Sequence, residues 1–107
     1  MKRNSPSMDA IVAPYLEIEG VIAAALVSSD GLRVASAGGD ELDLEALAAY
    51  AASVMSSAVG LADELETDLP SSLALDFPER HLILAPVSED LFLLLASDRG
   101  GILTGLP

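Results

Sequence analysis

The one histidine, His81, is the side chain best suited to acid–base chemistry near neutral pH. It stands beside Arg80 at the start of an expected strand, where a lone histidine usually has a structural role. No serine lies in a G-x-S-x-G turn, so a Ser-His-Asp triad would depend on this one residue. The glycine pairs 38–39 and 100–101 fit neither a P-loop nor a dinucleotide-binding motif, and predict no phosphate site.

Two acidic clusters, DELDLE at 40–45 and DELETD at 63–68, suggest calcium binding as one interpretation. Neither cluster has the alternating carboxylates, central glycine and terminal glutamate of an EF-hand loop. The first cluster stands near an expected helix N-terminus, where negative charge is favourable. The second stands at the C-terminal end, where negative charge is unfavourable, which keeps open a partner with basic residues.

Arg33, Arg80 and Arg99 lie in or beside expected hairpins. One of them could act as an arginine finger on a nucleotide-hydrolysing partner. Arginines at strand ends more often balance charge on an acidic surface. The residues therefore favour a binding module over an enzyme, with no catalytic residue, no metal and no cofactor.

The chain has 107 residues and a formal net charge of −12, from 17 acidic and five basic residues. Nucleic-acid binding needs a basic stripe, which is missing here, and anionic membrane surfaces are disfavoured for the same reason. No apolar run reaches the ~18 residues of a membrane span, and we expect no membrane insertion. The start lacks the apolar segment of a secretory signal. The absence of cysteine fits a reducing compartment, so we expect a cytoplasmic protein.

The N-terminal half predicts a helix and a hairpin. Ser5 and Pro6 can open the helix, which Pro14 should kink or break. The run 21–27 is apolar at nearly every position, as in a strand covered on both faces. Asp30-Gly31 is a favoured tight turn into a second strand at 32–36.

The C-terminal half predicts one long helix at 44–65, capped by Asp43, and three short strands at 71–77, 81–87 and 91–97. Pro86 should end or bulge the second of these strands. We expect a single domain at 7–99 between tails at 1–6 and 100–107. Hairpins on both sides of one crossover helix predict an α+β fold with helices packed on a sheet.

The long helix has an apolar stripe and an opposite face without charge in its middle. We expect the stripe to form core; it comprises Leu44, Leu47, Ala51, Val54, Met55, Ala58, Leu61, Ala62 and Leu65. The opposite face carries Ala49, Ala52, Ser53, Ser56 and Gly60, and glycine lowers the stability of an exposed helix by ~1 kcal/mol. Close helix contact explains this face better than solvent. The neighbour could be a second copy, a partner protein or the N-terminal helix.

The ordered combination of Gly20-Val21, a hydrophobic strand, Asp30-Gly31, a long helix rich in small residues and three final strands resembles the roadblock / dynein light chain family, in its bacterial and archaeal branch. The resemblance covers roughly residues 8–99. It implies a profilin-like, five-stranded antiparallel sheet of order 2-1-5-4-3. Pro14 and the short C-terminal segment GGILTGLP depart from the family pattern.

The resemblance also implies a homodimer in which the long helices pack together and the third strands pair edge to edge, through Leu73 and Leu75. The implied role is a non-enzymatic regulator of a small Ras-like GTPase, as in the GTPase-activating partners of motility and polarity systems. The main alternative is an assembly scaffold or signalling-complex subunit with no effect on hydrolysis. A small-molecule sensor would need a roomy apolar pocket, which an aromatic-poor core makes a weaker hypothesis.

Overall fold

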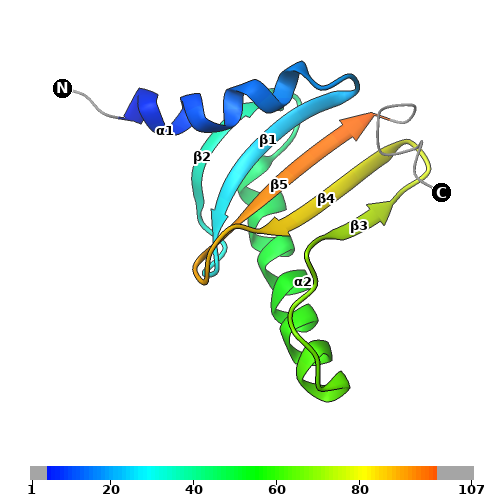
Figure 1. Cartoon of the computed structure of the whole chain (residues 1–107). Coiled ribbons are helices and arrows are strands. Elements are labelled where there is room, and N and C mark those ends of the chain that lie inside the picture. Colours follow the sequence, from blue (N-terminus) through cyan, green and yellow to red (C-terminus); the bar gives the residue numbers. More distant parts are fainter. Residues whose placement is uncertain (1–4, 99–107) are drawn as a thin grey trace.

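The computed structural model describes the backbone of residues 5–98, and the side chains from residue 8 onward. Figure 1 shows the elements in chain order: α1 (Ser5–Val12), the 3₁₀ helix η1 (Ala13–Glu17), β1 (Val21–Ser28), β2 (Arg33–Gly38), α2 (Leu44–Leu65), β3 (Leu73–Asp76), β4 (Arg80–Pro86) and β5 (Leu91–Asp98). The predicted order of elements is confirmed. The residues 1–4 and 99–107, which hold most of the two expected tails, lie outside the described part.

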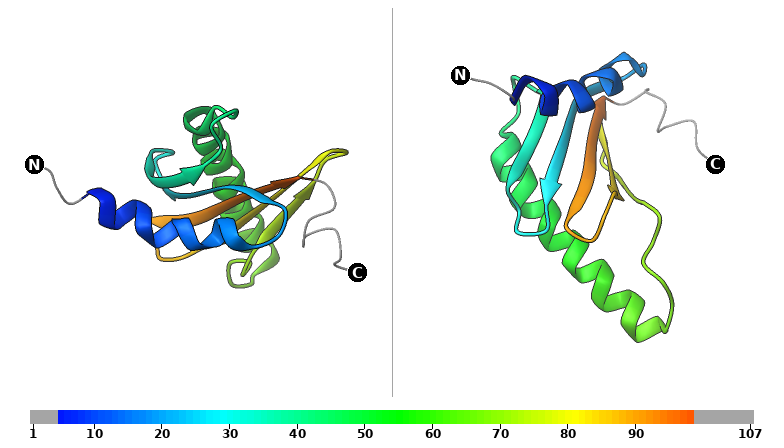
Figure 2. Two further views of the ribbon diagram at one scale, coloured as in Figure 1. Left: turned by 90° about the horizontal axis from the view of Figure 1, so that it is seen from above. Right: turned by 60° about the vertical axis from the view of Figure 1, so that its left-hand side comes forward.

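The five strands form one antiparallel sheet of order β2-β1-β5-β4-β3, as the family resemblance implied. Helix α2 lies on one face of the sheet, and α1 with η1 lies on the other (Figure 2). Strand β1 is near the middle of these layers: Ala25 and Val27 belong to the α2-side core, while Ala24 and Leu26 pack with Val12 of α1. The prediction that this strand is covered on both faces is confirmed.

Proline explains how the first helix ends. The α-helix stops at Val12, and the chain continues as a 3₁₀ turn that contains Pro14. Proline has no backbone N–H and its ring clashes with the preceding turn, so it cannot continue an α-helix. The predicted break is confirmed. At the other end α1 includes Ser5 and Pro6, which the domain boundaries assigned to the tail; proline fits a first helical turn because no donor is needed there.

The β1–β2 turn is fitted to α2. Gly31 has φ +88°, so the Asp30-Gly31 turn occurs as predicted, with glycine at the position that needs a positive φ. A Cβ built on Gly31 would lie 3.3 Å from the Cα of Ala49 and 3.5 Å from the Cβ of Ala52. The turn therefore packs directly against the helix. This contact within the chain explains why Ala49 and Ala52 have small side chains.

Helix α2 begins where the sequence predicts. Its N-cap is Asp43, whose Oδ1 accepts a hydrogen bond from the backbone N–H of Ala46 at 3.0 Å. The last residue is Leu65, and Glu66 follows in the left-handed conformation, with φ 57°. A left-handed residue directly after a helix is a common C-terminal stop, although glycine usually occupies it.

We expect Asp43→Ala to lower the free energy of unfolding by about 1 kcal/mol, because one donor of the first helical turn loses its partner. Urea titration followed by circular dichroism measures this change. Asp40→Ala is the matched control, since Asp40 is an exposed neighbour in the same loop and makes no hydrogen bond or salt bridge described for residues 5–98. An equal loss in both variants would contradict the capping role of Asp43.

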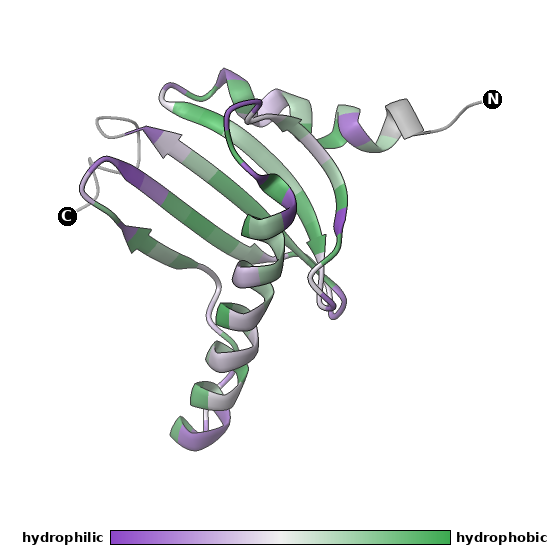
Figure 3. Ribbon diagram, turned by 180° about the vertical axis from the view of Figure 1, so that it is seen from behind, coloured by the Kyte–Doolittle hydropathy of each residue, from purple (hydrophilic) through white to green (hydrophobic). Residues whose placement is uncertain are grey.

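The predicted core stripe of α2 is only partly covered. Four residues of the stripe are buried, namely Leu44, Ala51, Ala58 and Ala62; Ala48, which the prediction left out, is also buried. Leu61 and Leu65 are 63% and 72% exposed, so their assignment to the core of one chain was wrong. The C-terminal half of α2 extends past the end of the sheet and has no strands beneath it (Figure 3).

The two edges of the sheet differ. On the β2 edge, Asp9 of α1 accepts a hydrogen bond from the backbone N–H of Ser36 at 3.1 Å. On the opposite edge, β3 pairs with β4 alone, in register Leu73↔Leu84 to Asp76↔His81. Strand β4 ends at Pro86, as predicted. Within the described residues, β3 is therefore the edge that stays open to another strand.

Candidate interaction surface

Next to the buried residues of α2, further apolar side chains form a second stripe that is partly exposed to solvent. It comprises Leu47, Tyr50, Val54, Leu61 and Leu65; at ~100° per residue these lie on one side of the helix. Tyr50 is 75% exposed, and Leu47 and Val54 are half-buried. We call this set the α2 stripe.

The α2 stripe is one wall of an apolar trough. The trough has a volume of about 490 Å³ and lies between α2 and the strands β3 and β4. We define it by its main lining residues: Leu47, Tyr50, Val54, Leu75, Phe77 and Leu82. A second hollow, of about 450 Å³, continues along Leu61 and Leu65 toward Leu69. In Figure 3 most of β3 and β4 lies to one side of α2, and only part of these strands, including Leu73 and Leu84, packs into the core on the α2 side. Residues 5–98 thus leave apolar surface of α2 and of β3–β4 exposed at the open edge of the sheet.

The residues predicted for a dimer interface lie in two places. Ala49, Ser53, Ser56 and Gly60 are exposed on α2, while Ala52 is half-buried against the chain's own core. A Cβ built on Gly60 would meet nothing within 4 Å, so no neighbour among the residues that the structure describes explains that glycine. Leu73 and Leu75 are half-buried on β3; Leu73 packs against the α2-side core and Leu75 lines the trough.

Tyr50 and Phe77, the two aromatic residues of the trough, were not predicted as interface residues from the sequence. Tyr50 lies three residues after Leu47 and four before Val54, so helical spacing already placed the three side chains together. The predicted core stripe included Leu47 and Val54 and left the tyrosine out. The position of Tyr50, an aromatic residue at the margin of the predicted core stripe, was the sequence feature that could have indicated a second apolar contact of α2.

His81 has a partner but no catalytic geometry. Its Nδ1 lies 2.8 Å from Oδ1 of Asp76, and its imidazole is buried. In the sheet register Asp76, His81 and Ser97 stand opposite one another on β3, β4 and β5. Ser97 is completely buried, however, so no substrate can reach its Oγ, and neither that atom nor His81 Nε2 has a hydrogen-bond partner among the described residues. We interpret the pair with Asp76 as structural.

The two arginines in the described part are both paired with carboxylates of their own chain. Arg80 Nε lies 3.2 Å from Asp98 Oδ1, and Arg33 lies 3.8 Å from Glu45. Such exposed pairs contribute little stability, but they place each guanidinium beside a negative charge. This weakens the arginine-finger hypothesis for Arg33 and Arg80. Arg99 lies outside the described residues.

By length and composition, α2 is apolar enough to cross a membrane, and it is the one such helix in residues 5–98. The sequence has no unbroken apolar run long enough to span a membrane. The mean hydropathy of α2 is nevertheless high, because alanine, leucine and valine make up most of the helix. Only 22% of its most apolar 18-residue window is buried in the monomer. A helix that lies between a sheet and another protein surface has the same composition.

Comparison with known proteins agrees with this arrangement. The family model of the Roadblock/LC7 domain matches residues 8–97. No curated protein matches the sequence. Among solved structures, MglB of Myxococcus xanthus superposes with a TM-score of 0.85 at 18% identity, over 97% of this chain and 79% of that one.

Two further structures give the same result. The gliding protein MglB of Thermus thermophilus has a TM-score of 0.80 at 19% identity, over 97% of this chain and 82% of that one. A Roadblock/LC7 domain of Streptomyces avermitilis has a TM-score of 0.78 at 16% identity, over 96% and 84%. At such identities the likeness concerns the fold, whereas the family model matches the sequence itself over most of its length. The chain belongs to the Roadblock/LC7 domain family.

Proposed function

We propose that the protein is a homodimeric, non-catalytic regulator of a small Ras-like GTPase and acts in the cytoplasm. The observation that supports it most is the apolar trough beside an open β3 edge. Two copies joined through β3 would continue the sheet, and the α2 stripe of each copy would cover the trough of the other. The interface would bury apolar side chains from Leu47 to Leu65 and satisfy the unpaired backbone groups of β3.

The α2 stripe is favoured over the small-residue face as the helix contact of this dimer. The stripe carries large exposed apolar side chains, and it borders the open strand. The face with Ser53, Ser56 and Gly60 lies farther round the helix and carries no large apolar side chain. It stays a prediction for contact with a second copy or with the GTPase.

The proposal of a GTPase partner rests on the family and on the similarity to MglB. If the dimer accelerates hydrolysis, we expect it to reposition the GTPase's own catalytic groups, because Arg33 and Arg80 are each paired within the chain. An assembly scaffold is the second candidate, since a dimer with apolar and acidic surfaces can join partners without changing any rate.

The test combines binding and hydrolysis. The purified protein is mixed with each small Ras-like GTPase of its own organism, in GDP and GTP-analogue forms, and single-turnover GTP hydrolysis is then measured. We expect binding of one GTPase in one nucleotide state and a change in its hydrolysis rate. Binding without a rate change would favour the scaffold, and absence of binding to every GTPase would contradict both roles.

A further inference from the structure

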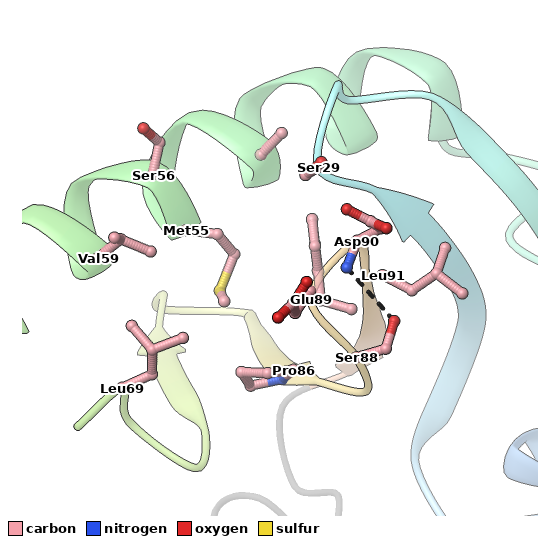
Figure 4. A pocket seen from close by; sticks show the side chains of 12 residues that line it. Ser29, Met55, Ser56, Val59, Leu69, Pro86, Ser88, Glu89, Asp90 and Leu91 are labelled. Carbon is pink, nitrogen blue, oxygen red and sulfur yellow. Dashed lines mark hydrogen bonds between the residues drawn. The ribbon is translucent and has the colours of Figure 1, made fainter.

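A third hollow lies on the other flank of α2, away from the trough. Its volume is about 280 Å³, and it separates the middle of α2 from the β4–β5 turn at residues 87–90. We call it the Met55 groove and define it by Met55, Val59, Leu69, Pro86, Glu89 and Asp90. Figure 4 shows Met55 pointing from α2 into the hollow, with Glu89 and Asp90 on the turn across from it.

The groove has an apolar floor built from three distant parts of the chain. Met55 is half-buried, Val59 is 41% exposed and Leu69 is 51% exposed. Pro86 completes the floor at the end of β4. Proline has no backbone N–H, so no hydrogen-bond donor is left unpaired at this position. Methionine adapts its shape to different apolar partners, which suits a binding surface more than a fixed core.

The rim of the groove is acidic and uncompensated. Glu89 and Asp90 are exposed, and neither forms a salt bridge in the part of the chain that the structure describes. No lysine or arginine of the described residues lines the hollow. The acidic cluster 63–68 immediately precedes Leu69 in the sequence, and its acidic residues are also exposed. The negative charge that lines the groove is thus that of Glu89 and Asp90, beside an apolar floor.

We propose that the Met55 groove binds a segment of a partner protein in which apolar side chains are flanked by lysine or arginine. The apolar side chains would lie on Met55, Val59 and Leu69, and the basic groups would reach Glu89 and Asp90. Complementary charge raises the rate of encounter and fixes the orientation of such a segment, while the apolar contact provides affinity. This proposal goes beyond the proposed function, because a protein that carries such a segment need not be a GTPase.

The groove and the α2 stripe can be used at the same time. At ~100° per residue, Met55 points roughly 105° away from the centre of the α2 stripe, and Ala52, Ser56 and Val59 point roughly 145–165° away from it. A dimer formed through the stripe therefore leaves both of its grooves accessible. Contact between two copies through the small-residue face would instead cover Ser56 at the groove margin.

The probe is an acetylated amphipathic peptide of about 14 residues, with leucines on one helix face and lysines beside them. It is titrated into the full chain labelled with ¹³C at its methionine methyl groups, of which there are three. We expect the Met55 methyl signal to shift with saturation while the Met8 signal stays in place. The same peptide with glutamate for lysine, and an oligolysine without leucine, are expected to bind at least about tenfold more weakly.

Two double variants separate a specific rim from the overall negative charge. Glu89→Lys/Asp90→Lys is expected to weaken binding about tenfold or more at roughly 150 mM salt, where distant charges are largely screened. Asp40→Lys/Glu41→Lys is the matched control, because it changes an adjacent exposed acidic pair by the same charge; we expect less than about a twofold effect. Glu89→Gln/Asp90→Asn tests whether the rim carboxylates contribute to peptide binding, without introducing positive charge. Val59→Ser tests whether the apolar floor contributes to it.

Equal weakening by both lysine variants would overturn the proposal, since it would show attraction by net charge alone. A Met55 signal that does not move would also overturn it. GTPase binding is measured separately on the same variants, so failure of the groove and failure of the proposed function give different results.

Discussion

Leu61→Glu is expected to convert the proposed dimer to monomer, with dimer affinity lowered by roughly 100-fold or more, about 2.7 kcal/mol. Leu61 is 63% exposed in one chain, so the folded monomer tolerates a charge there. In the proposed dimer the same side chain enters the apolar surface of the other copy, where a carboxylate loses its water without gaining a partner. Sedimentation velocity over a range of protein concentrations measures the change.

Two further substitutions make the result specific. Leu61→Lys reverses the sign of the new charge and should also dissociate the dimer, which excludes repulsion from nearby Asp63 and Glu64 as the cause. Ser53→Glu places the same carboxylate on the small-residue face and should leave the dimer intact. Dissociation by Ser53→Glu but not by Leu61→Glu would place the helix contact on the face that the sequence first suggested.

Gly38→Ala is expected to lower the free energy of unfolding by about 2–4 kcal/mol. Gly38 has φ +72°, and a Cβ there would lie 2.5 Å from the carbonyl oxygen of Ile22. That oxygen belongs to the backbone of β1 and also accepts the N–H of Gly39 at 2.9 Å, so it cannot move aside without loss of another bond. Urea unfolding at one fixed protein concentration measures the loss.

Gly60→Ala is the matched substitution with the opposite expected sign. The site is helical, and an added Cβ meets open space within the chain, so alanine should raise the stability by about 0.5–1 kcal/mol. A destabilised or dissociated Gly60→Ala protein would mean that another molecule fills that space. In that case the small-residue face is an interface after all.

Local signals predicted most of the fold because each one concerns a few adjacent residues. Asp43 caps its helix by a contact with Ala46, and Pro14 breaks α1 through its own ring. The extent of α2, 44–65, followed from its cap and its periodicity. The order of the strands depends on contacts far apart in sequence, and it came from the family resemblance and not from the residue pattern.

The interaction surface was harder to predict, because helical periodicity does not tell which molecule covers a stripe. Leu61 and Leu65 repeat in phase with Ala51 and Ala58, yet the sheet ends before it reaches them. Ala52 matched the spacing of an interface, but the turn at Gly31 already approaches it. The Met55 groove joins three separate segments, and no spacing along the sequence connects Met55 with Glu89.

The hydrogen bond from Ser36 to Asp9 sets a limit on assembly. A sheet joined through β3, as proposed, would present β2 at both of its outer ends, where Asp9 of α1 accepts a hydrogen bond from one outward N–H of the strand, that of Ser36. In the proposed dimer, a further strand could add to β2 only by displacing Asp9 from this N–H, so growth of the sheet beyond two copies would be opposed. The short N-terminal helix, beside the break at Pro14, would then limit the assembly to a closed dimer and prevent a fibre.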